Sequence, residues 1–93
     1  MSVGVLEATL FVGDSGSLKS KRRIVKSIKD QIRHKFNVSI AEVGAQDLWQ
    51  RAEIEVAAVG TDGTYVRSVL TAVVKHIQFH RGVEILDWDI EIL

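Results

Sequence analysis

The segment from Ser17 to Phe36 carries the strongest chemical signal in the sequence, because it concentrates positive charge. It holds eight of the twelve Lys and Arg residues and one acidic residue, Asp30, although the chain has a formal net charge of zero. Clustered ammonium and guanidinium groups attract phosphate and other anions. A helix face kept only for solubility would be expected to mix both signs of charge. The segment therefore predicts either an anion-binding face or a solvated basic helix surface.

Other residues offer weaker chemistry. His76 and His80 are spaced to bind zinc from one helix, but no third ligand is evident and the sequence has no cysteine. The stretch GDSGSLKSK, residues 13–21, could cradle an anion, although a turn followed by a helix cap explains it equally well and the spacing of a P-loop is missing. The sequence shows no nucleophile, base and orienting acid at a recognisable catalytic spacing. We therefore predict no metal, no cofactor and no enzymatic activity.

These residues must be positioned by elements that the hydrophobic pattern predicts. Alternating apolar residues indicate strands, and apolar residues spaced three or four apart indicate helices. Ser17 is placed to cap the first helix, and Thr61 or Asp62 the second. We predict strands over residues 3–12, 37–45, 51–60 and 83–93, and helices over residues 18–36 and from about residue 63 onward.

The resulting order is β-α-β-β-α-β. Two interleaved right-handed β-α-β units form a ferredoxin-like α+β sandwich, with a four-stranded antiparallel sheet in the order 4-1-3-2 and both helices on one face. A chain of 93 residues fits one such domain, residues 1–93. No apolar run reaches the roughly 18–20 residues of a membrane helix, so we expect no membrane span.

The basic residues of the first helix form a stripe beside its apolar face. Four of them fall within about 60° of arc and two more widen the arc to about 120°. We call these six the basic stripe and predict that they bind nucleic acid: Lys19, Arg22, Arg23, Lys26, Lys29 and Arg33. Lys21 projects into the apolar arc, and we expect it to snorkel to the surface from the first turn. The second helix adds Arg67, Lys75, His76, His80 and Arg81 near its outer side and end.

The balancing acids have the outward parity of their strands. They are predicted to lie together on the open sheet face: Glu7, Glu53, Glu55, Asp87, Asp89 and Glu91. Val5, Phe11, Val59 and Ile85 are expected among them, whereas Leu86, Trp88, Ile90 and Ile92 are expected inward. Carboxylates repel phosphate, so RNA is not expected on this face. Trp49 either caps the core or is exposed for a partner.

Several of these segments resemble a known family. Ser17-Leu18-Lys19, Lys21-Arg22, Phe36-Asn37-Val38-Ser39, Glu42 and Trp49-Gln50-Arg51-Ala52 are similar to the YlxP-like family of small bacterial proteins, a domain of unknown function. The resemblance spans nearly the whole chain and implies a ferredoxin-like fold. It supplies no activity, cofactor or catalytic residue. Family members are often encoded near translation-initiation and ribosome-maturation factors, which implies a link to ribosomal RNA.

Three hypotheses about function follow, one of which is an enzyme whose site assembles across a dimer. The first is a non-enzymatic, cytoplasmic RNA- or ribosome-associated factor that binds through the basic stripe. The second is a protein-interaction or small-ligand regulatory module with no nucleic-acid role. A homodimer is expected through the edge strand at residues 37–43, which carries only Glu42 as a charge, or through contact of the acidic sheet with the basic helices.

Overall fold

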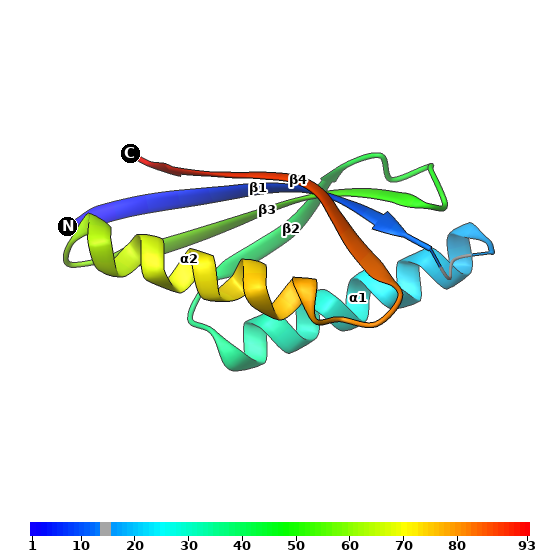
Figure 1. Ribbon diagram of the computed structural model, residues 1–93, viewed down its shortest axis with the longest axis horizontal. Helices are drawn as coiled ribbons and strands as arrows, with labels where there is room; N and C mark the ends of the chain where they lie inside the picture. The colour runs from blue at the N-terminus through cyan, green and yellow to red at the C-terminus, as the bar shows by residue number, and fades with distance from the viewer. Residues whose placement is uncertain (14–15) are drawn as a thin grey trace.

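A computed structural model describes residues 1–13 and 16–93 of the chain. Its six elements follow the predicted order (Figure 1). They are β1 (Ser2–Val12), α1 (Leu18–Lys35), β2 (Ser39–Gly44), β3 (Arg51–Gly60), α2 (Gly63–Gln78) and β4 (Val83–Ile92). The four strands form one antiparallel sheet in the order β2-β3-β1-β4, which is 4-1-3-2 counted from the other edge. Both helices cover the same face of this sheet (Figure 1). The ferredoxin-like prediction is confirmed.

Both predicted helix caps are present. The Ser17 side chain accepts a hydrogen bond from the backbone N–H of Ser20 at 3.1 Å. The Asp62 side chain accepts one from the N–H of Tyr65 at 2.8 Å. Such caps satisfy N–H groups that have no partner inside the helix, and each typically stabilises a fold by about 1 kcal/mol.

The core lies between the sheet and the helices. Inward residues of the two central strands, such as Leu6 and Ile54, are buried against Ile28 of α1 and Leu70 of α2. Burying one large aliphatic side chain contributes about 1.5–3 kcal/mol, so this single layer is the main source of stability. It also fixes which face of α1 remains outside.

Strand β4 departs from the predicted alternation because it contains a β-bulge. Its pairing with β1 shifts between Thr9 and Leu10: Thr9 faces Asp87, whereas Leu10 faces Ile85. Leu86 is the extra residue and is 49% exposed, while Ile85 packs against the core. The predictions for these two residues are therefore wrong. A bulge adds one residue to one strand, which reverses the parity on one side of it.

Two further predictions need correction. Trp88 faces the helical side, as its pairing with Ala8 requires, but it is 43% exposed because β4 is an edge strand. The second strand is shorter than predicted, because β2 begins at Ser39. Asn37 and Val38 lie before the strand. No helix in residues 1–13 or 16–93 is long and apolar enough to cross a membrane.

Candidate nucleic-acid interface

The basic stripe lies on the outer side of α1. Five of its six side chains are exposed, and Lys29 is partly buried. Arg22 and Arg23 make no salt bridge with any described residue, and neither does Lys19. These three cations at the N-terminal half of the helix are therefore free to meet an anion.

The C-terminal half of the stripe is partly neutralised by Asp30. The carboxylate lies 2.7 Å from the Lys26 ammonium and 3.7 Å from the Arg33 guanidinium. The hydrogen bond from Lys26 is the main cause that holds the pKa of Asp30 below its usual value. Because this pair is exposed, an approaching phosphate can compete for both cations.

Arg33 also joins α1 to the edge of the sheet. Its Nη2 donates a hydrogen bond of 2.9 Å to the carbonyl oxygen of Ile40 in β2. The stripe thus borders the edge strand and does not point wholly away from the sheet. One backbone acceptor of β2 already has a partner within the chain, so this edge is better protected than its sequence suggests.

Lys21 does not snorkel, so that prediction is wrong. Its side chain is fully buried, its ammonium lies 2.6 Å from Oε2 of Glu42, and it donates a 2.7 Å hydrogen bond to the carbonyl oxygen of Ala45. Ala45 follows β2 in the left-handed region, with φ of 58°. Oε2 of Glu42 is buried and accepts a hydrogen bond from no described group, so its contact with Lys21 is an ion pair. The pair therefore joins the start of α1 to the end of β2, and Lys21 adds no charge to the exposed surface of α1.

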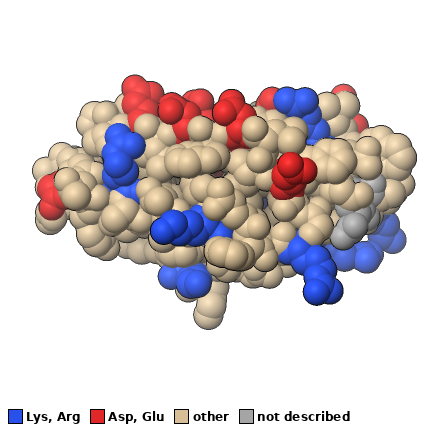
Figure 2. Space-filling view, in the orientation of Figure 1, with Lys and Arg blue, Asp and Glu red and all other residues tan. Residues whose placement is uncertain are grey.

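The open sheet face is acidic, as predicted. Glu7 lies between Glu55 on β3 and Asp89 on β4, and the next row places Thr9 between Glu53 and Asp87. Directly opposed residues have Cβ atoms about 4.5–5.5 Å apart, so these carboxylates repel a polyanion together. Figure 2 shows acidic side chains along the sheet side of the molecule and most basic ones along the helical side. No group of three or more residues suited to hold a metal ion is found in the described part of the chain.

A second basic surface lies between the ends of the two helices. A groove of about 610 Å³ is lined by Lys35 and Phe36 at the C-terminal end of α1, and by Lys75, Phe79 and Arg81 from the end of α2 onward. The sequence predicts Lys75 and Arg81 near this end, but Phe36 and Phe79 are not predicted to join them. Phe79 directly follows a helix whose last turn is basic. A large apolar residue at such a position is the sequence signal that could have indicated this groove.

An apolar cluster occupies one end of the sheet. Phe11, Leu48, Trp49 and Leu86 are all at least 38% exposed and line a shallow pocket of about 280 Å³ with Arg51. Trp49 is half exposed, so part of its ring is accessible to a partner. The predicted anion cradle at residues 13–21 includes Asp14 and Ser15, which lie outside the described residues.

The sequence matches a family model over residues 3–90, and the model is described as a protein of unknown function (DUF503). The chain belongs to this DUF503 family. It is 38% identical over 82 residues to the uncharacterized protein YlxP of Bacillus subtilis (strain 168), and the match covers 88% of this chain and 89% of YlxP. The resemblance predicted from the sequence is therefore confirmed.

A solved structure shares the fold. It is LarC2, the C-terminal domain of a cyclometallase involved in the synthesis of the NPN cofactor of lactate racemase. The likeness has a TM-score of 0.50 at 12% identity and covers 100% of this chain but only 55% of the LarC2 chain. At this identity it supports the arrangement of strands and helices and nothing about the chemistry of this DUF503 member.

Proposed function

We propose that this DUF503 protein is a non-enzymatic, cytoplasmic factor that binds RNA, including RNA of the ribosome, through the basic stripe on α1. The stripe residues contact phosphates, with Arg22 and Arg23 as the leading contacts because neither has an ion-pair partner among the described residues. Phosphate contacts position a protein on RNA but carry little sequence information.

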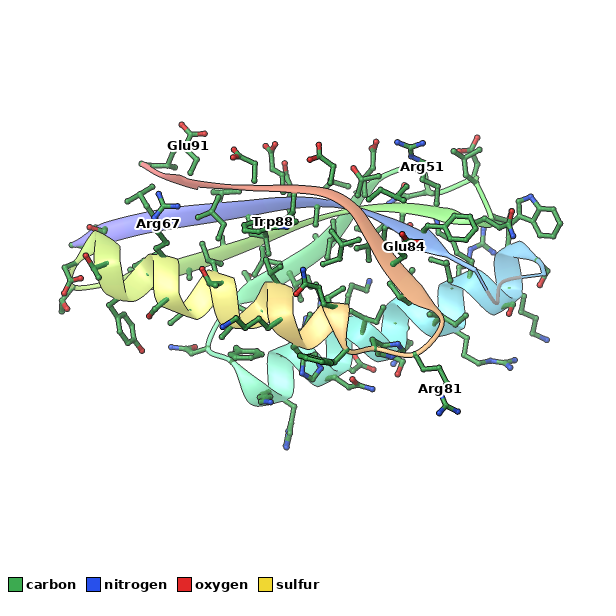
Figure 3. All side chains as sticks on the ribbon, in the orientation of Figure 1. Arg51, Arg67, Arg81, Glu84, Trp88 and Glu91 are labelled. Carbon is green, nitrogen blue, oxygen red and sulfur yellow. The ribbon has the colours of Figure 1, made fainter. Side chains whose placement is uncertain are left out.

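The observation that carries this proposal is the separation of charge into two layers. Six carboxylates lie on the open sheet face, whereas seven of the twelve basic residues are fully or partly exposed on α1. Figure 3 shows Glu91 projecting from the sheet side and Arg81 projecting below the helices. Mutual repulsion along α1 is unfavourable unless a polyanion meets it. RNA is a polyanion that would meet α1 favourably and the sheet unfavourably.

The test is co-sedimentation with ribosomal subunits and direct binding to RNA at several salt concentrations. Neutralising about 4–6 phosphates of a single strand predicts a slope near −3 to −4 of log affinity against log salt. Arg22→Glu with Arg23→Glu should abolish binding without unfolding the protein, since both side chains are exposed.

A matched control is Arg51→Glu with Arg67→Glu. Both arginines are exposed and lie outside α1, so this variant has the same change in net charge at a different place. We expect it to retain most of the binding. Equal loss of RNA binding in both variants would show that only net charge matters and not its position on α1. Unchanged binding in the α1 variant would refute the proposal.

The exposed apolar cluster supports a second candidate, a protein-interaction module. Phe11, Leu48, Trp49 and Leu86 form an apolar surface at the end of the sheet that a partner protein could cover. This candidate predicts that Trp49→Ala, and not reversal of the stripe, disrupts association with ribosomes or other partners. Self-association through β2 belongs to the same candidate.

A further inference from the structure

The interhelical groove, lined by Lys35, Phe36, Lys75, Phe79 and Arg81 among others, lies on the opposite flank of α1 from the basic stripe. Gln31 and His76 also line it, and His76 Nε2 lies 3.2 Å from Oε1 of Gln31. The stripe instead borders β2 through Arg33. The groove is therefore a separate surface that the proposed function does not use.

Aromatic rings in the groove have two different environments. Phe36 is partly buried, and His76 packs edge-on against it with 6.1 Å between the ring centroids. The Lys35 ammonium lies 5.7 Å from the centroid of the Phe36 ring. Phe79 is 89% exposed, so nearly the whole ring faces solvent. Packing against the core does not account for Phe79, and an exposed ring at the mouth of a groove offers a stacking surface.

The charge of the groove has one sign. Lys35, Lys75 and Arg81 line it together with His76 and His80, and no carboxylate is among its lining residues. Basic residues in the last turn of a helix also favour the helix dipole, and this alone would explain Lys75 and His76. It does not explain an exposed phenyl ring set among them. Positive groups beside a free aromatic face match a ligand with a planar base and a phosphate.

We propose that the interhelical groove binds a nucleotide unit of single-stranded RNA, with the base stacked on Phe79 and the phosphate held among Lys35, Lys75 and Arg81. A volume of about 610 Å³ falls within the ordinary range of small-molecule sites, so one nucleotide fits. Stacking on an aromatic ring tolerates every base, so the groove selects unpaired nucleotides over duplex and shows little sequence preference. The inference rests on the proposed RNA-binding function for its class of ligand and adds a second site to it, and its test separates the two.

The experiment compares two fluorescein-labelled probes by fluorescence anisotropy: a short oligouridylate and an abasic ribose-phosphate strand of equal length. The wild-type protein should bind the oligouridylate more tightly, because only that probe can stack. Phe79→Ala should weaken oligouridylate binding about 5- to 150-fold and leave the abasic strand unchanged. Tyr65→Ala is the control, since Tyr65 is a 57% exposed aromatic residue of α2 that does not line the groove.

A second pair of variants tests the phosphate contacts. Lys75→Ala should weaken both probes and reduce the salt slope by about 0.7, the value of one lost contact with a single strand. Arg67→Ala removes an exposed cation from the first turns of the same helix, outside the groove, and should change neither. Free uridine monophosphate should compete weakly, whereas tighter binding of the mononucleotide than of the strand would identify a small-molecule site and overturn the proposal.

The outcomes distinguish this inference from the proposed function. Equal binding of both probes, or no effect of Phe79→Ala, overturns the groove proposal even if reversal of Arg22 and Arg23 abolishes binding. Loss of base-dependent binding in Phe79→Ala, with no effect of the double reversal, supports the groove and refutes the stripe. Absence of binding to either probe overturns both.

Discussion

The buried pair between Lys21 and Glu42 should make this small domain sensitive to loss of either charge alone. Lys21→Met removes the ammonium and leaves the carboxylate of Glu42 with 14% exposure, while the Ala45 carbonyl loses its donor. Breaking a buried ion pair from one side costs about 3–5 kcal/mol. We expect about 3–4 kcal/mol here, since limited water still reaches Glu42.

The opposite substitution should cost more. Glu42→Leu leaves an ammonium with no exposed surface and with only the Ala45 carbonyl as its partner, so we expect about 4–5 kcal/mol. Domains of this size have a free energy of unfolding of about 5–15 kcal/mol, and each lost kcal/mol lowers Tm by roughly 4–8 °C. Either single substitution therefore brings the fold close to its limit of stability.

The double variant Lys21→Met with Glu42→Leu removes both charges together. Apolar replacement of a buried pair is often neutral, so we expect stability to return to within about 2 kcal/mol of wild type. Urea unfolding followed by circular dichroism measures the free energy of unfolding of the wild type, the two single variants and the double variant. Lys26→Met is the control, because its pair with Asp30 is exposed. Single variants as stable as wild type, or a double variant that loses the sum of both single effects, would refute the reasoning.

Two other predictions concern the sheet edge and the interhelical groove. Arg33→Ala frees the carbonyl of Ile40 on β2 and should promote dimerisation through this edge. Sedimentation equilibrium measures the association constant, with Arg22→Ala as the control. Equal association constants in the two variants would contradict an edge dimer. Burial, followed by the nearby Lys35 and His80 charges, lowers the pKa of His76 below 6.5 in the folded protein. The unfolded chain therefore binds this proton more readily, so the associated stability is present above about pH 6.5 and is lost as the pH falls through the folded pKa. The urea midpoint should depend less on pH in His76→Gln, and an identical pH profile would show that His76 is not responsible.

The regular part of the fold could be predicted because its patterns are regular. Leu6 and Ala8 alternate with outward residues in a central strand whose pairing with β3 has no irregularity, so parity alone places Glu7 and Glu55 side by side. In β4 the alternation changes phase, and the only trace in the sequence is two adjacent apolar residues, Ile85 and Leu86. A single continuous pattern across this strand therefore misplaces its first half.

The contacts between elements could be predicted only in part. Lys21 in the apolar arc of α1 and Glu42 with the inward parity of β2 are both visible in the sequence, and together they indicate a buried pair. Solvation of each residue considered alone favours snorkelling, which is why the pair was missed. The interhelical groove depends on how α1 and α2 lie against each other, and no local pattern encodes the distance between Phe36 and Phe79.

The two charged layers also determine how the molecule appears to a partner in salt solution. Electrostatic forces at physiological ionic strength decay over about 8 Å, whereas the shortest dimension of the molecule is 17 Å. An approaching partner therefore senses the layer that it faces and very little of the opposite one. The electric fields of the two charged layers cancel only far from the molecule, where salt has already screened them. At contact distance this protein presents two oppositely charged surfaces, and each attracts charges of the opposite sign.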